Sequence, residues 1–462
     1  MRKFNCIALA VVATAFSEID FDAVDGKVAP LHQAGQPPFP MTEISGWGEG
    51  MFHYLPEAGI RYSRLHDTGG AYGESRFVDI SNLFRDFNAD ENDPKSYDFT
   101  FTDKLLEKML AAGIEPFFRL GETIENFANI KRYRTFVPPD KAKWARICEQ
   151  VIAHYTEGWA NGFRHKISRW EIWNEPDFTT ADWNPMWSGT CEDFLELYEV
   201  TATRLKKRFP HLKIGGYGSC GFWAITSAEK AKREGKDPRT DERKAQEEYH
   251  VEFFRRFMDR VQAKKLPLDF FTFHSYSEVP DMLRQVEWAC DEMKRRGLEK
   301  VELNLDEWLP APAHEKLGTA RQAAEIAAVM AGASHTRLGM AMIYDAHCGV
   351  GNYSPLFSAL TYKPHPAYSV FKFYDVLYKA GTRVKTVEDR ANGLYVAAAT
   401  DSKGKGWALV TNVGASARPL PRVSGDWKPC SCRAIDATRT DVEVSVPQAI
   451  APNQVLLLGF AR

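Results

Sequence analysis

Trp170-Glu171-Ile172-Trp173-Asn174-Glu175-Pro176 is the stretch of this chain that decides the fold. Its aromatic and β-branched residues predict a buried strand, and Pro176, which cannot donate a hydrogen bond to a neighbouring strand, predicts where that strand stops. Glu175 is therefore expected at the carboxyl end of the strand. In barrels of alternating strands and helices the catalytic residues collect at this end, because the loops there form the large concave surface of the fold.

A second stretch has the same pattern, with Pro310 following Val301-Glu302-Leu303-Asn304-Leu305-Asp306-Glu307-Trp308. One Asn-Glu-Pro tripeptide can be a plain strand end, but two strand ends that each carry an acid predict a pair of carboxylates. The two glutamates are 132 positions apart. A barrel of about 250 residues spends roughly 31 on each strand–helix unit, so the interval, without the charged stretch 227–248, fits about three units. Glu175 then ends the fourth strand and Glu307 the seventh.

Residues 30–374 alternate short apolar runs with amphipathic helical stretches, which predicts a parallel sheet covered by helices. The clearest unit is 103–120, where a helical pattern is followed by Gly113 and by the third strand at 114–120. A helix at 193–209 precedes the fifth strand at 213–216. The predicted fold class is α/β, a (β/α)8 TIM barrel.

Polar residues also end the other predicted strands. The second strand, 61–67, ends in His66 and Asp67, and the sixth, 268–276, ends in His274 and Tyr276. The eighth, 339–343, is followed by Tyr344 and Asp345. A lone histidine is more often a buried structural residue than a ligand-binding one. Two histidines at predicted strand ends favour a place in the site.

A smaller domain is expected after the barrel, since 462 residues suit a barrel plus a further unit. In residues 375–462, strand-like pieces alternate with turn residues, which predicts an antiparallel β-sandwich. Residues 16–29 are expected to add strands to it.

The composition indicates a neutral substrate. Lys and Arg total 59 against 61 for Asp and Glu, a net charge of −2, so no strong field attracts nucleic acid or an anionic membrane. The mixed charges of 227–248 predict a solvated insertion at the rim of the site. Tryptophans often fill cores, but sugar rings also stack on them, and we expect about a third of five to line the ligand surface. These five are Trp170, Trp173, Trp183, Trp187 and Trp308.

Neither a metal nor a cofactor is expected. The 8 cysteines include no CxxC pair and no histidine at metal-like spacing. Residues 1–15 combine Arg2 and Lys3, a short apolar run and an Ala-Thr-Ala sequence, which fits either a signal peptide or an accessory strand. The protein is accordingly secreted or periplasmic in the first case and cytoplasmic in the second. No later stretch reaches the about 20 apolar residues that span a bilayer.

With these residues in view, the chain resembles glycoside hydrolase family 39 of clan A, the family of β-xylosidases and α-L-iduronidases, over most of its length. The matching segments occur in the family's order. They are Tyr97-Asp98-Phe99-Thr100, Gly113-Ile114-Glu115-Pro116-Phe117, Trp170 to Pro176, Lys213-Ile214-Gly215-Gly216, Asp269 to Tyr276, and Lys363-Pro364 with Phe371-Lys372-Phe373.

The resemblance implies a retaining glycosidase whose acid/base is Glu175 and whose nucleophile is Glu307. It implies sugar-binding roles for Asn174, His66, His274 and Tyr276. A retaining mechanism needs the two carboxyls about 5–5.5 Å apart, a gap that the ends of strands four and seven of one barrel can supply. From the same chemistry we expect Asn174 to bind the sugar 2-hydroxyl, Tyr276 to orient Glu307, and the charge of Glu307 together with partial burial to keep Glu175 protonated.

Three positions depart from the family pattern. Asp67 stands where the family usually has glycine, Glu122 lies in a loop that is commonly apolar, and Tyr344 stands where relatives usually have tryptophan. Both acids are expected to bind extra hydroxyls, and Trp308 and Tyr344 to contact the sugar. The neighbourhood of His274 offers no basic residue for a uronate carboxylate, which disfavours an iduronidase.

The function predicted from the sequence is a retaining exo-glycosidase acting on an oligosaccharide or a polysaccharide side chain, with β-xylosidase as the first choice. Two alternatives stay open. One keeps the mechanism but changes the sugar to α-L-arabinofuranose, β-glucose or β-galactose, or makes the enzyme endo-acting. The other is a barrel that binds a glycan without cleaving it, since a fold alone does not prove activity. The sequence does not fix an oligomeric state.

Overall fold

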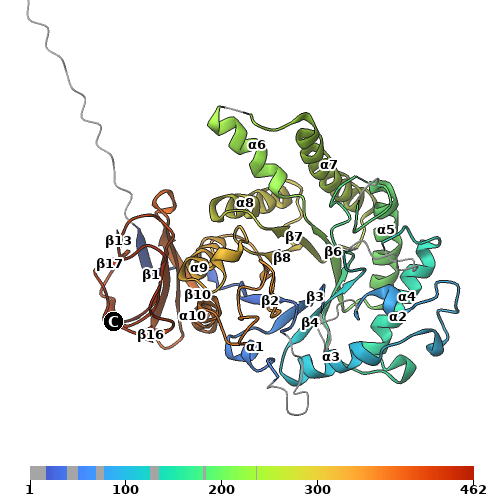
Figure 1. The fold of residues 1–462 in the computed structure, drawn as a ribbon, viewed down its shortest axis with the longest axis horizontal. Helices are drawn as coiled ribbons and strands as arrows, with labels where there is room; N and C mark the ends of the chain where they lie inside the picture. The colour runs from blue at the N-terminus through green and yellow to red at the C-terminus, as the bar shows by residue number, and fades with distance from the viewer. Residues whose placement is uncertain (1–16, 39–49, 69–76, 125–134, 181–183, 236) are drawn as a thin grey trace, which may run out of the picture.

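The computed structural model describes residues 17–38, 50–68, 77–124, 135–180, 184–235 and 237–462. The predicted leader, 1–15, and Trp183 lie outside these residues. Figure 1 shows a barrel with a separate β-sheet unit beside it.

The barrel is closed by eight strands in the order in which they occur in the chain, and every neighbouring pair is parallel. The predicted fold class is confirmed. Each predicted strand has its counterpart, in the expected order. The strands are β2 (Gln33–Gly35), β3 (Tyr62–Leu65), β4 (Glu115–Leu120), β5 (Arg169–Ile172), β6 (Lys213–Ser219), β7 (Phe270–Ser275), β8 (Glu302–Trp308) and β9 (Met340–Ile343).

Helices surround this barrel, and side-chain caps mark the starts of some of them. Asp140 accepts a hydrogen bond from the Lys143 N–H, and Thr190 and Asp193 form a reciprocal capping box. The described helices are α1 (Tyr54–Glu57), α2 (Ile80–Leu83), α3 (Thr100–Ala111), α4 (Lys141–Thr156), α5 (Cys191–Arg208), α6 (Trp223–Glu234), α7 (Asp241–Lys264), α8 (Val279–Arg295), α9 (Ala320–Ala333) and α10 (Pro366–Ala380). The charged stretch 227–248 lies in α6, α7 and the turn between them.

The barrel interior changes from apolar to charged along its axis. Phe117, Phe270, Met340 and Met342 form a buried cluster near the amino ends of the strands, with Tyr62 packed against it. Side chains alternate along a strand, so the next inward position after Tyr62 is Arg64, which is 1% exposed. The apolar floor therefore supports a layer of buried charges below the carboxyl ends.

The second unit is an eight-stranded sheet in the order β14-β1-β10-β11-β12-β18-β15-β16, accompanied by a two-stranded sheet, β13-β17. The strands are β1 (Glu18–Lys27), β10 (Thr382–Val387), β11 (Leu394–Thr400), β12 (Gly406–Asn412), β13 (Arg418–Pro419), β14 (Arg422–Val423), β15 (Lys428–Ile435), β16 (Val442–Glu443), β17 (Ala449–Ile450) and β18 (Gln454–Ala461). The alternating strand pattern predicts antiparallel strands but not how they divide between sheets. In place of the two sheets of a sandwich, the structure has one eight-stranded sheet and one two-stranded sheet.

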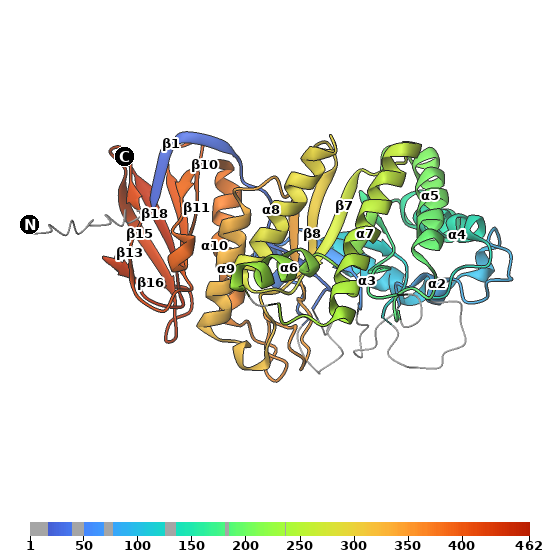
Figure 2. The same cartoon turned by 90° about the horizontal axis from the view of Figure 1, so that it is seen from above.

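Segments from both ends of the chain meet in this unit. β1 pairs antiparallel with β10, as expected for residues 16–29. Helix α10 continues to Ala380, beyond the predicted boundary at residue 374. The sheet packs on α9 and α10, on the side of the barrel opposite α4 and α5 (Figures 1 and 2). Among the described residues, no helix is long and apolar enough to cross a membrane.

Candidate active site

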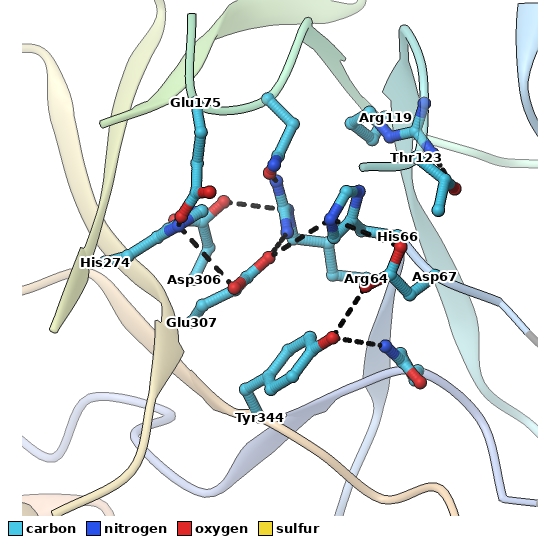
Figure 3. Close-up of polar contacts among 12 residues, drawn as sticks. Arg64, His66, Asp67, Arg119, Thr123, Glu175, His274, Asp306, Glu307 and Tyr344 are labelled. Atoms are coloured by element: carbon cyan, nitrogen blue, oxygen red, sulfur yellow. Dashed lines mark hydrogen bonds and ion pairs between the residues drawn. The ribbon is translucent and has the colours of Figure 1, made fainter. Parts of the chain in front are cut away.

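The two glutamates meet at the carboxyl end of the barrel. Glu175 follows β5 and Glu307 lies near the end of β8, with His274 of β7 between them. One oxygen of each glutamate and one ring nitrogen of His274 all lie within 4.8 Å of one another. Figure 3 shows the three side chains converging, with His274 and Glu307 on strands and Glu175 on the loop after β5. This spacing fits the pair of carboxyls that a retaining glycosidase uses.

Strand β5 ends earlier than the sequence predicts, and Glu175 lies in the loop that follows. Trp173 and Glu175 both have left-handed backbones, with φ of 74° and 47°, which turns the chain out of the sheet. The Glu175 N–H donates to the Gly218 carbonyl at 3.0 Å, so β6 supports this turn. A β-carbon at Gly218 would approach Arg64, Asn174 and His274 within 3.0–3.2 Å. Glycine at 218 therefore leaves space for the polar groups of the site.

Arg64 forms hydrogen bonds with several side chains of the site. It is not among the residues expected from the sequence. Its guanidinium donates to Glu307 Oε1 at 2.5 Å, to Asn174 Oδ1 at 2.6 Å and to Glu171 Oε2 at 2.7 Å. Because arginine only donates, the oxygen of Asn174 must face it. The Asn174 amide nitrogen is buried and has no hydrogen-bond partner in the described part of the chain. It is therefore free to donate to a ligand.

Two further acids share the charge of Arg64. Asp306 Oδ2 lies 2.8 Å from its Nε, and Glu171 also accepts from the Thr272 hydroxyl at 2.6 Å. Burial raises the pKa of Asp306 well above its ordinary value. Burial also acts to raise the pKa of Glu171, but the charge of Arg64 and several hydrogen bonds, including that from Thr272, together outweigh it and lower this pKa. The guanidinium of Arg64 thus faces three buried acids, Glu171, Asp306 and Glu307.

The surroundings of the two glutamates differ in a way that separates their roles. Burial raises the pKa of Glu175 to about 7, against the opposing charge of Arg64. Burial also raises the pKa of Glu307, but His274, Arg64 and the Tyr276 hydroxyl, which donates to Oε2 at 2.6 Å, oppose that rise. Glu307 is accordingly the better-stabilised anion and Glu175 the acid. The main cause of the raised pKa of Glu175 is thus its burial and not, as expected from the sequence, the charge of Glu307.

His274 lies against both catalytic candidates. Its Nδ1 is 2.6 Å from Glu175 Oε1 and 3.5 Å from Glu307 Oε2. Burial lowers the pKa of His274 to about 4, so the ring is neutral near pH 7. A neutral imidazole can accept a hydrogen bond from the protonated acid or donate one to the carboxylate. His274 therefore suits both states of Glu175.

A second polar group lies beside the nucleophile candidate. His66 Nε2 is 3.9 Å from Glu307 Oε1 and 3.6 Å from Asp67 Oδ1. The Tyr344 hydroxyl donates to Asp67 Oδ2 at 2.8 Å and accepts from Gln36 Nε2 at 2.9 Å. The Tyr344 and Tyr276 rings lie 6.0 Å apart, edge to face. Asp67 and Tyr344 thus belong to the same pocket as Glu307 (Figure 3).

Glu122 and Trp308, two of the predicted contact residues, are both buried. The carboxylate of Glu122 is buried and accepts from the backbone and hydroxyl of Ser81, at 3.0 and 2.6 Å. Trp308 is 0% exposed, as are Trp170, Trp173 and Trp187. Full burial alone does not exclude a ligand contact, since Asn174 is also 0% exposed. The expectation that about a third of the five tryptophans line the ligand surface therefore stays a prediction. These rings fill the core around the barrel strands.

The expectation that the chain offers no cluster of metal-ligating types needs correction. Besides the Glu175–His274–Glu307 group, the structure brings donor atoms of Asp177, Cys220 and His250 within 4.8 Å of one another. These three come from different elements, so no sequence spacing reveals them. Both Asp177 oxygens already accept hydrogen bonds, from the Ser219 hydroxyl at 2.6 Å and from the Cys220 N–H at 3.2 Å. The group ties the loop after Glu175 to β6.

The closed barrel and the two glutamates at the ends of its fourth and seventh strands define a glycoside hydrolase. A family model described as glycosyl hydrolases family 39 matches residues 40–315. The chain belongs to this family, as its sequence resemblance indicates.

Similar proteins agree with this assignment. A β-xylosidase of Geobacillus stearothermophilus is 24% identical over 51% of this chain and 40% of its own length. A β-xylosidase of Caldicellulosiruptor saccharolyticus is 25% identical over 37% of this chain and 33% of its own length. The matched region thus spans less than half of either curated relative.

Solved structures share the fold over nearly the whole chain. A glucosidase of Croceicoccus marinus has a TM-score of 0.71 at 18% identity and covers 97% of this chain and 99% of its own. A monomeric β-xylosidase of Caulobacter crescentus has a TM-score of 0.62 at 16% identity and covers 96% and 99%. At these identities the likeness supports the fold alone.

Replacing Arg64 with lysine is expected to lower kcat about 100-fold, because one ammonium group cannot donate to Glu307, Asn174 and Glu171 together. Steady-state kinetics on any hydrolysed aryl glycoside, with thermal unfolding in parallel, measures the effect. Arg119→Lys is the matched control, since Arg119 is the neighbouring buried barrel arginine and bonds Asp79 instead of the glutamates. Equal losses of kcat in both variants would show that Arg64 acts only through stability.

Proposed function

We propose that this protein is a retaining exo-glycosidase that hydrolyses a neutral glycan by double displacement, with β-linked xylose as the sugar to test first. The observation that carries the proposal is the pair of glutamates within 4.8 Å, one held as an acid and one as an anion. The names of the curated relatives support xylose. No step needs a metal or a cofactor.

In the first step Glu307 attacks the anomeric carbon and forms a covalent glycosyl ester. Glu175 gives its proton to the departing glycosidic oxygen, so the alcohol leaves neutral. The hydrogen bonds from Arg64 and Tyr276 hold Glu307 in place before the attack. These hydrogen bonds weaken as the charge of Glu307 is lost in forming the ester. Their weakening contributes to the activation free energy of the step.

In the second step Glu175 acts as a base. Once Glu307 is esterified, it no longer carries a negative charge beside Glu175, and the pKa of Glu175 falls. The carboxylate then takes a proton from water. The water oxygen attacks the anomeric carbon from the side opposite Glu307, and the bond between that carbon and Glu307 breaks. Two inversions at the same carbon retain its configuration.

Asn174 is the proposed partner of the sugar 2-hydroxyl. Arg64 fixes its oxygen, and its unpartnered amide donates to the hydroxyl. This contact strengthens as the sugar approaches an oxocarbenium-like state, so it contributes more to the transition state than to substrate binding.

The test is hydrolysis of a panel of 4-nitrophenyl glycosides by the wild-type protein and by Glu307→Ala. The panel contains β-xyloside, β-glucoside, β-galactoside and α-L-arabinofuranoside. Turnover of one glycoside that the substitution abolishes supports the proposal and identifies the sugar. Silence on the panel, with binding but no cleavage of xylan-derived oligosaccharides, would instead favour a barrel that binds a glycan without hydrolysing it.

The pH profile of kcat/KM is expected to be bell-shaped with its alkaline limb near pH 7. Glu175 must be protonated in the free enzyme, so activity falls as pH rises through its pKa of about 7. Glu307 must be ionised, so activity also falls as pH drops through the pKa of Glu307. Asp177 is the matched control because burial raises its pKa to about 7 as well. Asp177→Asn should keep the alkaline limb; its loss would assign that limb to Asp177.

A further inference from the structure

Asp67 places a carboxylate near Glu307, across His66 from it. We propose that Asp67 sets the sugar preference by accepting a hydrogen bond from the exocyclic hydroxyl of a hexopyranoside, so that a hexoside is hydrolysed faster than the pentoside that lacks this group. The inference rests on the proposed glycosidase function and narrows its substrate class.

The backbone at this position favours glycine, and the aspartate is held there by its neighbours. Asp67 has φ of 49°, in the left-handed region that L-residues adopt at a cost and that Asp and Asn tolerate best. Its Oδ2 accepts from Tyr344, whose hydroxyl in turn accepts from Gln36. Asp67, Tyr344 and Gln36 therefore form one hydrogen-bonded unit that orients the Asp67 carboxylate.

The other carboxylate oxygen is available to a ligand. Asp67 Oδ1 is buried and makes no hydrogen bond within the described ranges. Its neighbour at 3.6 Å is Nε2 of His66, a ring that burial keeps neutral by lowering its pKa well below the ordinary value. An unpaired buried carboxylate oxygen costs stability unless a bound group donates to it. Asp67 Oδ1 can therefore accept a hydrogen bond from a hydroxyl of a bound ligand.

Asp67 Oδ1 lies close enough to Glu307 to contact the sugar that Glu307 attacks. The same His66 nitrogen lies 3.6 Å from Asp67 Oδ1 and 3.9 Å from Glu307 Oε1. One monosaccharide attached at Glu307 can therefore reach Asp67. In Figure 3, Asp67 and Tyr344 lie on the far side of Glu307 from Glu175, away from the leaving group that Glu175 protonates.

The chemistry of the acceptor separates hexosides from pentosides. Xylopyranosides and glucopyranosides have the same ring hydroxyls, and the glucoside adds one hydroxymethyl group. Compared with glycine at 67, this chain adds one acceptor. A uronic acid would instead bring a carboxylate toward Asp67, which like charge disfavours. A neutral hexopyranoside is therefore the class of sugar that this unit fits.

The test compares substrates that differ only in the group in question. Galactoside and fucoside differ only by the 6-hydroxyl, and glucoside and xyloside only by the hydroxymethyl group. With 4-nitrophenyl β-glycosides, Asp67→Gly is expected to lower kcat/KM about 30-fold on the hexoside that the enzyme cleaves best. It should change kcat/KM on fucoside and xyloside less than about threefold. Tyr344→Phe removes the hydrogen bond that orients the Asp67 carboxylate. It should lower kcat/KM on the hexoside by less than Asp67→Gly does.

Asp441→Gly is the matched control, because Asp441 also has a left-handed backbone, with φ of 59°, and pairs with Arg433 in the β-sheet unit. It should leave kcat/KM unchanged on all these substrates. Equal losses on both members of a substrate pair in Asp67→Gly would overturn the proposal, since Asp67 would then bind a shared hydroxyl or act through His66. No loss would overturn it as well.

A binding measurement separates failure of this inference from failure of the proposed function. If the wild type cleaves no glycoside, the proposed function fails, but calorimetry with deoxynojirimycin and its analogue lacking the hydroxymethyl group still tests Asp67. Tighter binding of deoxynojirimycin that Asp67→Gly abolishes supports the inference. Equal affinity for the two compounds, or no binding of either, overturns it.

Discussion

Glu307→Ala is expected to lower kcat by about four orders of magnitude or more, because the substitution removes the group that forms the covalent bond. Sodium azide should restore part of the activity by entering the space that the carboxylate leaves. Because azide attacks from the same side as Glu307 and no second displacement follows, the product should be a glycosyl azide of inverted configuration. Proton NMR of the azide product measures this.

The reciprocal experiment on Glu175→Ala controls the assignment. Here Glu307 still forms the ester, and azide replaces the water that Glu175 would activate, so the glycosyl azide should keep the substrate's configuration. Inverted azide from Glu175→Ala together with retained azide from Glu307→Ala would show that the two roles are exchanged.

Glu175→Ala is expected to separate substrates by their leaving groups. The dinitrophenolate of a dinitrophenyl glycoside leaves without protonation, so kcat/KM for this substrate should fall less than about tenfold. For a natural oligosaccharide, kcat/KM should fall about a thousandfold or more. The physical reason is the environment of Glu175, whose burial raises its pKa to about 7 and keeps it protonated in the free enzyme. Parallel rate measurements on the two substrates give the ratio.

Glu122→Gln is a suitable control for this experiment. Glu122 is also a buried glutamate with a pKa raised by burial, to about 8, but it bonds Ser81 and not the catalytic pair. Its substitution should show no leaving-group dependence. If Glu175→Ala reduced both substrates to the same extent, Glu175 would not be the acid.

The order of the barrel strands could be predicted because local chemistry marks their ends. Pro176 and Pro310 follow acids at two of them, and His66 and His274 lie at two others. Parallel pairing then brings the carboxyl ends of all strands to one face. The glutamate pair follows from that geometry without knowledge of any side-chain contact.

The contacts beneath the pair could not be predicted in the same way. Arg64, Glu171 and Asp306 each stand in a strand that is predicted to be buried, and charged residues in several buried strands are a signal that partners exist. The sequence does not say which charges meet, since the partners are 107 positions apart in the case of Arg64 and Glu171. Likewise, nothing local distinguishes Trp308, which is buried, from a tryptophan that lines a pocket.

The central claim is that Glu307 carries the sugar as a covalent ester. The most direct measurement is incubation with a 2-deoxy-2-fluoro glycosyl fluoride of the sugar that the panel identifies, followed by intact-mass analysis and peptide mapping. The 2-fluorine slows both steps because it destabilises their oxocarbenium-like transition states. Fluoride is a good leaving group and speeds only the first step, so the ester accumulates. One fluorosugar per chain is expected on Glu307, and none in Glu307→Ala. A label on Glu175, or turnover with inverted product and no covalent species, would contradict the central claim.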